Sequence, residues 1–473
     1  MRYYVPPECR EEHLSELLTT CERTGIKEVF LFTTGYLAIP QFQTIDELAA
    51  TCQQHLAYCA DRLREAGLVF HLNVMHTLGH LYVPEREVQY FGFQRQVQAD
   101  GRPGTHPVLD PLCPNLQKYL HDAYRLYGQL KPELLFVDDE YKIDMHQCFA
   151  PQRVARFAER FGCANDPLAV QVLLQSGGYA ARMLMAELMT DDLVALAVML
   201  REAVHEVSPD TRLGLMHPYA VQHDVARVAR AFAGHGRPFV RPQIFFYREN
   251  APLTEYPDHF GILDFWKASL PEDFEQFPEC EHYPYDPALK SPVAAFAHHA
   301  YILAVGEPRV ALSLNSFSGK VPASESRSLV DYVAERKGEL HAVETLLADG
   351  SAVAGVGFWQ NPDMFKLGQK NPLLKALQTR GVPLCNVRQP EEAVLHWGSS
   401  LEYLDDARLD KVLQAGAFLD LGALKILRSR GRLEQIGLTL GERCKALDVM
   451  HIPYKRLNGG DELWPFFYFI GRL

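Results

Sequence analysis

The sequence predicts an α/β fold, a (β/α)8 TIM barrel followed by a smaller, shortened α/β domain. Short apolar runs rich in β-branched and aromatic residues alternate with longer stretches of helical periodicity, which is the pattern of a parallel sheet. No glycine-rich turn follows the first run, so the dinucleotide-binding fingerprint is missing. Polar residues and long loops follow many different strands, as at the mouth of such a barrel. An open doubly wound sheet stays the alternative.

Eight apolar runs supply the predicted barrel strands. They cover residues 27–34, 67–75, 132–139, 211–218, 237–247, 274–282, 309–317 and 351–359. A helix is predicted between the first two runs, because Thr44 can cap a series of apolar residues at helical spacing and Gly67 can end it. Residues 115–130 and 326–347 show the same periodicity.

The pattern of predicted strands and helices changes after Trp359. A helix, a glycine stop and a short strand are predicted in "NPLLKALQTRGVPLCNV", and further short strands and helices follow. We therefore expect a barrel over residues 1–375 and a small α/β domain over residues 376–473, too short for a complete doubly wound domain.

Composition excludes several classes of protein. A formal net charge of −12 argues against binding to nucleic acid, which needs clustered Lys and Arg. Ten scattered cysteines without a CxxC pair indicate reduced thiols and a cytoplasmic location. No apolar segment is long enough to span a membrane, so a membrane is not expected as a partner.

The stretch "ELLFVDDEYKIDMH", residues 133–146, runs from a predicted buried strand into three consecutive carboxylates: Asp138, Asp139 and Glu140. At the mouth of a barrel these acids would lie where active sites are built. Like charges at close range raise one another's pKa, and a carboxyl group kept protonated near neutrality can act as a general acid. The alternative is that they cap the next helix or pair with Lys142 and Arg153.

A second acidic cluster lies in "FPECEHYPYDPALKS", residues 277–291. Glu279 and Glu281 are at strand spacing, so both point the same way, and Tyr283 follows them. Carboxylates next to aromatic rings suit a sugar subsite. Two carboxyl groups on different strands that face one cavity form the arrangement of glycoside hydrolysis. The alternative is that Glu281 is a surface acid in a proline-rich loop.

Other polar and aromatic residues near strand ends are candidates for substrate binding. They are Asn73, His76, His217, Tyr219, Arg241, Tyr247 and Asn315, with Trp266 and Trp359 as stacking platforms. Each of them alone is also compatible with a satisfied core position.

A metal site is a further possibility for the acids after the third predicted strand and for nearby histidines. His76 and His80 have the i, i+4 spacing of zinc ligands on a helix, and Asp138, Asp139, Glu140 and His146 are further donors. Gly79 and the preceding strand argue against a helix there, and the glutamate of an HExxH motif is absent. We therefore expect neither a metal ion nor another cofactor.

The stretches "LFVDDEYKIDMHQCFAPQRVARFAERFG", "CEHYPYDPALKS" and "GVPLCNV", with the helical tail after it, resemble bacterial proteins related to glycoside hydrolases. These proteins combine a (β/α)8 barrel with a domain like a class I glutamine amidotransferase, and the arrangement is similar to that of the family 42 β-galactosidases. The resemblance implies that the smaller domain serves packing or assembly into a homo-oligomer. No Cys stands in a nucleophile elbow there, so amidotransferase chemistry is not implied.

In barrels of this kind the acid/base follows an Asn after the fourth strand, and the nucleophilic glutamate ends the seventh. The resemblance thus implies Glu140 as acid/base, Asp139 in the place of the Asn, and Glu281 as nucleophile. Our strand count places these residues after the third and sixth strands. The expected function is a retaining glycosidase that acts on a small oligosaccharide or glycoside. Alternatives are a barrel that binds carbohydrate without hydrolysis and a metal-dependent sugar isomerase or lyase.

Overall fold

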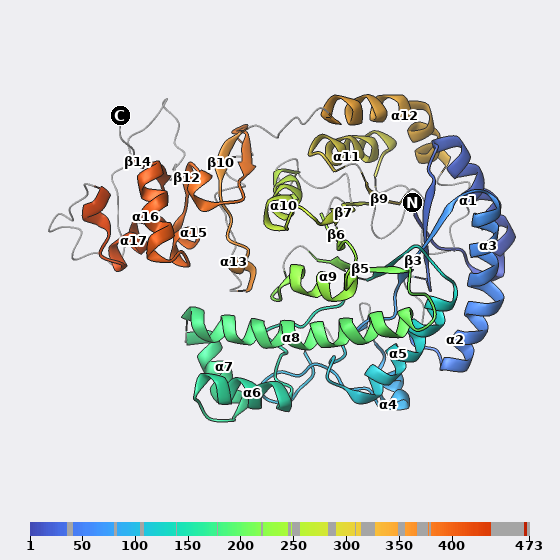
Figure 1. Cartoon of the computed structure of the whole chain (residues 1–473), viewed down its shortest axis with the longest axis horizontal. Helices are drawn as coiled ribbons and strands as arrows, with labels where there is room; N and C mark the ends of the chain where they lie inside the picture. Colours follow the sequence, from blue (N-terminus) through green and yellow to red (C-terminus); the bar gives the residue numbers. More distant parts are fainter. Residues whose placement is uncertain are drawn as a thin grey trace. The chain divides into compact units, whose positions relative to one another are not determined.

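The computed structural model describes residues 1–35, 41–79, 83–104, 108–138, 140–176, 178–218, 221–244, 247, 256–281, 290–307, 309–313, 327–348, 355–366, 377, 380–436 and 468–470 (Figure 1). The chain forms two compact units. The larger comprises residues 1–263 and 270–352, and the smaller comprises residues 264–269 and 353–473.

A curled parallel sheet forms the centre of the larger unit. Seven strands pair in chain order, and they are β1 (Arg2–Tyr3), β2 (Glu28–Phe32), β3 (Val69–Val74), β4 (Leu134–Val137), β5 (Arg212–His217), β6 (Phe239–Pro242) and β7 (Glu275–Gln276). After two further residues, β8 (Glu279–Cys280) pairs in parallel with β9 (Ala311–Leu312). If β7 and β8 are counted as one interrupted strand, the unit has the eight strands of a TIM barrel.

The interior of the larger unit is filled by large aromatic side chains from strands that are distant in the sequence. Phe30, Phe136, Phe239 and Phe277 belong to one buried cluster. The rings of Phe30 and Phe277 lie 6.1 Å apart, although they come from opposite ends of the strand order. Arg309, just before β9, also donates a hydrogen bond to Glu28 of β2. The sheet is therefore curled strongly enough to bring side chains of β2 close to residues near β7 and β9.

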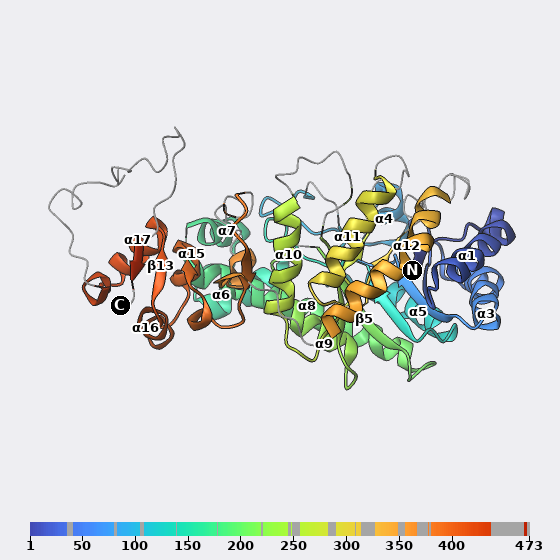
Figure 2. The same ribbon diagram turned by 90° about the horizontal axis from the view of Figure 1, so that it is seen from above.

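Helices cover the outside of this sheet (Figures 1 and 2). The helices of the larger unit are α1 (Arg10–Thr24), α2 (Ile45–Thr51), α3 (Ala57–Glu65), α4 (Glu85–Phe91), α5 (Pro114–Gln129), α6 (Pro151–Phe161), α7 (Pro167–Ser176), α8 (Gly178–His205), α9 (Val225–Ala233), α10 (Tyr256–Ser269), α11 (Pro292–Ala304) and α12 (Arg327–Ala348). Of these, α6 and α7 pack against α8. The last six residues of α10 are assigned to the smaller unit. None of the helices in the described part of the chain has the length and apolarity to span a membrane.

The predicted helix between Thr44 and Gly67 is confirmed. Thr44 and Glu47 form a capping box at its start. A π-helical turn, Cys52–Leu56, joins α2 to α3 without a break. Gly67 ends the helix with a φ of 72°, a left-handed conformation that favours glycine.

The smaller unit is built on a five-stranded sheet in the order β11-β10-β12-β13-β14. Its strands are β10 (Val356–Phe358), β11 (Leu384–Asn386), β12 (Leu395–His396), β13 (Ala417–Leu419) and β14 (Tyr468–Ile470), of which β14 is antiparallel to β13. Its further helices are α13 (Asp363–Lys366), α15 (Gly398–Glu402), α16 (Asp406–Ala415) and α17 (Leu421–Ser429). Apolar residues from α15, α16 and α17 pack with Trp359 into its core.

Two differences from the predicted strands change the count. The strand predicted at 351–359 is β10, and it pairs with β11 and β12 of the smaller unit. That unit comprises residues 264–269 and 353–473, where a domain over 376–473 was expected. The first strand, β1, is too short to show a periodicity and was not predicted. Because β1 comes first, Asp138 and Glu140 follow the fourth strand, and Glu281 follows the interrupted seventh.

Candidate active site

Arg2 lies at the centre of a buried cluster of acids at the carboxyl ends of the barrel strands. Its Nη1 donates to Oε2 of Glu281 from 2.5 Å and lies 3.5 Å from Oε1 of Glu279. Its Nη2 is 3.8 Å from Oδ2 of Asp138. All four side chains are at most 5% exposed. A single guanidinium group therefore joins acids that come from the ends of β4 and β8.

Asn73, on β3, fixes the orientation of this cluster. Its Oδ1 accepts from Nε of Arg2 at 3.0 Å, and its Nδ2 donates to Oδ2 of Asp138 at 2.6 Å. Asn73 is fully buried, so these hydrogen bonds replace those that its amide would make to water. The positions of β1, β3 and β4 are thereby coupled at one point.

Glu279 is held from the opposite side. Nη1 of Arg241, on β6, is 2.8 Å from Oε1 of Glu279, and the Tyr247 hydroxyl donates to Oε2 at 2.9 Å. Gln243 donates to the same hydroxyl at 2.6 Å. Burial raises the pKa of Glu279 well above its usual range, and the neighbouring Glu281 raises it further, against the opposing effect of Arg241. The site thus contains two adjacent carboxyl groups in different surroundings.

Lys290 supports the backbone at Glu281. Its Nζ donates to the carbonyl oxygen of Glu281 at 3.2 Å and lies 2.8 Å from Nδ1 of His298, on α11. Both side chains are almost fully buried. This contact fixes the point at which the chain leaves β8.

Glu140 lies on a tight turn after β4. The backbone N–H of Tyr141 donates to the carbonyl of Asp138, and that of Lys142 donates to the carbonyl of Glu140. The Tyr141 hydroxyl anchors the turn to the carbonyl of Leu193 on α8 at 2.6 Å. Glu140 itself is half-buried.

Arg153 is not the partner of the acidic stretch. It is fully buried, and its Nε donates to Asp192 at 2.7 Å while Nη2 lies 3.5 Å from Asp110. The alternative in which Arg153 neutralises the acids after β4 therefore does not hold.

His76 and His217 are almost fully buried near the ends of β3 and β5. The Tyr127 hydroxyl is 2.6 Å from Nδ1 of His76, whose ring also packs against Phe42. Burial lowers the pKa of His76 to about 4 and that of His217 to about 3. Both imidazoles are therefore neutral near pH 7. Their role in substrate binding stays a prediction.

Of the other predicted site residues, Trp266 and Trp359 belong to the smaller unit and not to the barrel. Asp139, Tyr219, Tyr283 and Asn315, together with His80 of the considered metal site, lie outside the described residues. Within the described ranges, no group of three or more His, Cys, Asp or Glu side chains could hold a metal ion.

Sequence reasoning missed three residues of this site: Arg2, Lys290 and His298. Arg2 belongs to a two-residue strand, and the Lys290–His298 pair joins a loop to a helix. Neither arrangement leaves a periodic signal, and an arginine that precedes aromatic residues in "MRYYVPP" is the only local hint.

The amino-acid sequence matches no protein-family model, and no curated protein matches it. Its structure is similar to that of a GH42 β-galactosidase from G. stearothermophilus, with a TM-score of 0.58 at 12% identity over 89% of this chain and 70% of that one. The chain has the fold of these β-galactosidases. The enzyme from the Antarctic haloarchaeon Halorubrum lacusprofundi gives 0.57 at 15% identity, over 87% of this chain and 70% of that one. The β-galactosidase from the psychrophilic Marinomonas ef1 has a TM-score of 0.56 at 12% identity, over 89% of this chain and 74% of that one.

Proposed function

We propose that the barrel is a glycoside hydrolase that cleaves a small oligosaccharide or glycoside with retention of the anomeric configuration. One observation carries the proposal: Arg2 joins Asp138 and Glu281, so acids separated by more than a hundred residues share one buried site. The shared fold with β-galactosidases supports it. So does the strand count, because the fourth and seventh strands are those that carry the two carboxyl groups in family 42.

In this proposal Glu140 donates a proton to the glycosidic oxygen while Glu281 attacks the anomeric carbon. The bond to the leaving group breaks and a glycosyl ester forms on Glu281. Glu140 then takes a proton from the water that hydrolyses this ester. Asp138, held by Asn73, and Asp139 contribute the negative charge that keeps the donor protonated and accept from a sugar hydroxyl. Arg2 and Lys290 fix the position of Glu281.

The test is turnover of a panel of nitrophenyl glycosides by the wild type and by Glu281→Gln. We expect the substitution to lower kcat by roughly a thousandfold or more, because the nucleophile is lost. Glu159→Gln, at an exposed position on α6, is the matched control and is expected to leave kcat unchanged. Undiminished turnover by Glu281→Gln would reject the assignment. Proton NMR of the first product formed distinguishes retention from inversion.

A second candidate is a barrel that binds carbohydrate without hydrolysing it. The buried ion pair between Arg2 and Glu281 favours it, because a carboxylate held at 2.5 Å by a guanidinium group already has a partner. Tight binding of a sugar by the wild type, with no hydrolysis across a wide glycoside panel, would support this second function.

For the smaller unit we propose a domain like that of the class I glutamine amidotransferases, which serves assembly into a homo-oligomer of a cytoplasmic bacterial protein. Its parallel sheet with antiparallel β14 at one edge supports the first part. Sedimentation equilibrium of the full chain tests the proposed assembly into a homo-oligomer. A single species at the monomer mass of 53.6 kDa would contradict it.

A further inference from the structure

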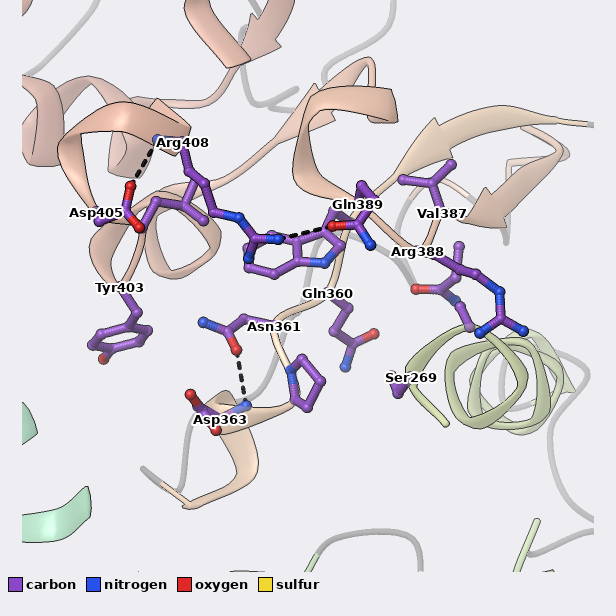
Figure 3. Close-up of a pocket in the computed structure, with 15 residues that line it drawn as sticks. Ser269, Gln360, Asn361, Asp363, Val387, Arg388, Gln389, Tyr403, Asp405 and Arg408 are labelled. Atoms are coloured by element: carbon purple, nitrogen blue, oxygen red, sulfur yellow. Dashed lines mark hydrogen bonds between the residues drawn. The ribbon is translucent and has the colours of Figure 1, made fainter. Parts of the chain in front are cut away.

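The smaller unit contains a cavity of about 350 Å³ at the carboxyl ends of β10 and β11 (Figure 3). Every residue that lines it belongs to this unit. The chain runs from β10 outward to β11 and then returns across β10 to β12, so the strand order reverses at β10. In open α/β sheets, ligands bind outside the carboxyl ends of the strands at such a reversal. The volume lies near the lower limit of ligand sites, about 300–1,000 Å³, and so indicates a small ligand.

Two amides line this cavity, and the oxygen of one of them is buried without a partner within the described part of the chain. Gln360, directly after Trp359, lines the cavity and is only 5% exposed. Oδ1 of Asn386 is buried without a partner, although the backbone N–H and Nδ2 of the same residue donate to Asp264 at 2.6 and 3.0 Å. A buried acceptor without a hydrogen bond is unfavourable, so Oδ1 of Asn386 points to a ligand that supplies the missing donor.

The charges at the cavity balance. Arg388 and Arg408 line it together with Asp363 and Asp405. Arg408 donates to Oε1 of Gln389 at 2.8 Å, and Asp405 accepts from the backbone N–H of Arg408 at 2.7 Å (Figure 3). A phosphate or nucleotide site needs an excess of positive charge, which this lining does not provide.

The remaining lining residues suit a molecule with both hydroxyl groups and apolar faces. Trp359 and Tyr403 offer aromatic rings, and the amides of Gln360, Asn361 and Asn386 combine donors with acceptors. Amides, balanced charges and rings together are complementary to a pyranose, whose hydroxyls donate and accept while its C–H faces pack on rings. We propose that this cavity is a binding site for a neutral mono- or disaccharide, separate from the barrel site and independent of hydrolysis.

The experiment uses the full chain carrying Glu281→Gln, titrated by calorimetry with galactose, glucose, mannose, xylose and lactose. At least one of these sugars should bind, and adding Gln360→Leu should weaken that binding about tenfold, since one to two hydrogen bonds are lost. Gln414→Leu, at an exposed position on α16, is the matched control and should leave the affinity unchanged. Hydrogen exchange with the same sugar should protect the segments 356–363 and 384–389.

Equal affinities in the Gln360→Leu and Gln414→Leu proteins would overturn the proposal, and so would sugar protection confined to peptides of the barrel. Binding of inorganic phosphate or AMP, in place of every sugar, to a site weakened by Gln360→Leu would also overturn it. The proposed hydrolase is tested separately, because Gln360→Leu in the otherwise unchanged chain should leave nitrophenyl glycoside turnover as it is. Loss of turnover on Glu281→Gln bears on the barrel alone.

Discussion

At the scale of single residues, Arg2 supplies a buried positive charge to the acids of the barrel site. Its guanidinium group is almost fully buried among Asp138, Glu279 and Glu281, and it stacks 4.8 Å from the Phe32 ring. A buried charge costs several kcal/mol unless it is compensated, and here Arg2, with Arg241 at Glu279, compensates three acids. The group therefore contributes to the stability of the barrel as well as to the position of Glu281.

We expect Arg2→Met to destabilise the protein by about 3–5 kcal/mol, because the acids it pairs with would stay buried without a counter-charge. Arg160→Met is the matched control, since it removes a half-exposed pair with Glu187 and should cost about 0.2–1 kcal/mol. Urea denaturation followed by tryptophan fluorescence measures both. Equal midpoints for the two variants would show that the acid cluster does not depend on Arg2.

The acidic part of this site was predictable, and its basic part was not. Asp138, Glu279 and Glu281 directly follow apolar runs, so their place at the strand ends can be read from the chain. Arg2 contributes to the site through a partner 279 positions away, and Lys290 through a helix that packs behind β8. Such contacts depend on how the sheet curls, which no local pattern contains.

At the scale of elements, helix ends show the closest agreement between sequence and structure. Thr44 accepts from the backbone N–H of Glu47 at 3.3 Å, and the Glu47 carboxylate accepts from the backbone N–H of Thr44 at 2.8 Å. These contacts are local, so a sequence window contains all of the groups involved. The assignment of 351–359 to the barrel failed for the opposite reason, because a short apolar strand fits either sheet and only pairing with Leu384 and Leu395 decides between them.

Thr44→Ala should destabilise the protein by about 1 kcal/mol, since the first turn of α2 loses its cap. Thr51→Ala lies in the same helix, where the Thr51 hydroxyl donates back to the carbonyl of Glu47 at 3.0 Å. That substitution should be neutral or slightly stabilising, because alanine is the better helix former. Thermal unfolding followed by circular dichroism compares the two, and a larger loss for Thr51→Ala would contradict the role of the cap.

At the scale of the whole molecule, buried histidines make stability depend on pH. Burial lowers the pKa of His76, His299 and His396 to about 4 and that of His217 to about 3, from 6.5. Below pH 6.5 the unfolded chain binds protons that the folded chain does not. The contribution of the buried neutral histidines to the free energy of unfolding is therefore complete above pH 6.5. It is lost as the pH falls from 6.5 toward 4.

The unfolding temperature should accordingly stay level from pH 8 to 7 and fall between pH 6.5 and 4. Each buried imidazole contributes about 1.4 kcal/mol per pH unit to that fall. His217→Asn should make the decline shallower, whereas His235→Asn, at an exposed position, should leave it unchanged. Differential scanning calorimetry across this range measures the slope, and identical slopes in the two variants would contradict the burial argument.

The ion pair between Arg2 and Glu281 also affects when the acid cluster can form during translation. The two residues are separated by 279 positions, and at about 5–20 residues per second the arginine emerges on the order of 15 to 55 seconds before its acidic partner. During that interval Arg2 can pair only with its earlier partners, Asn73 and Asp138. The acid cluster around Arg2 is therefore complete only after translation has passed β8.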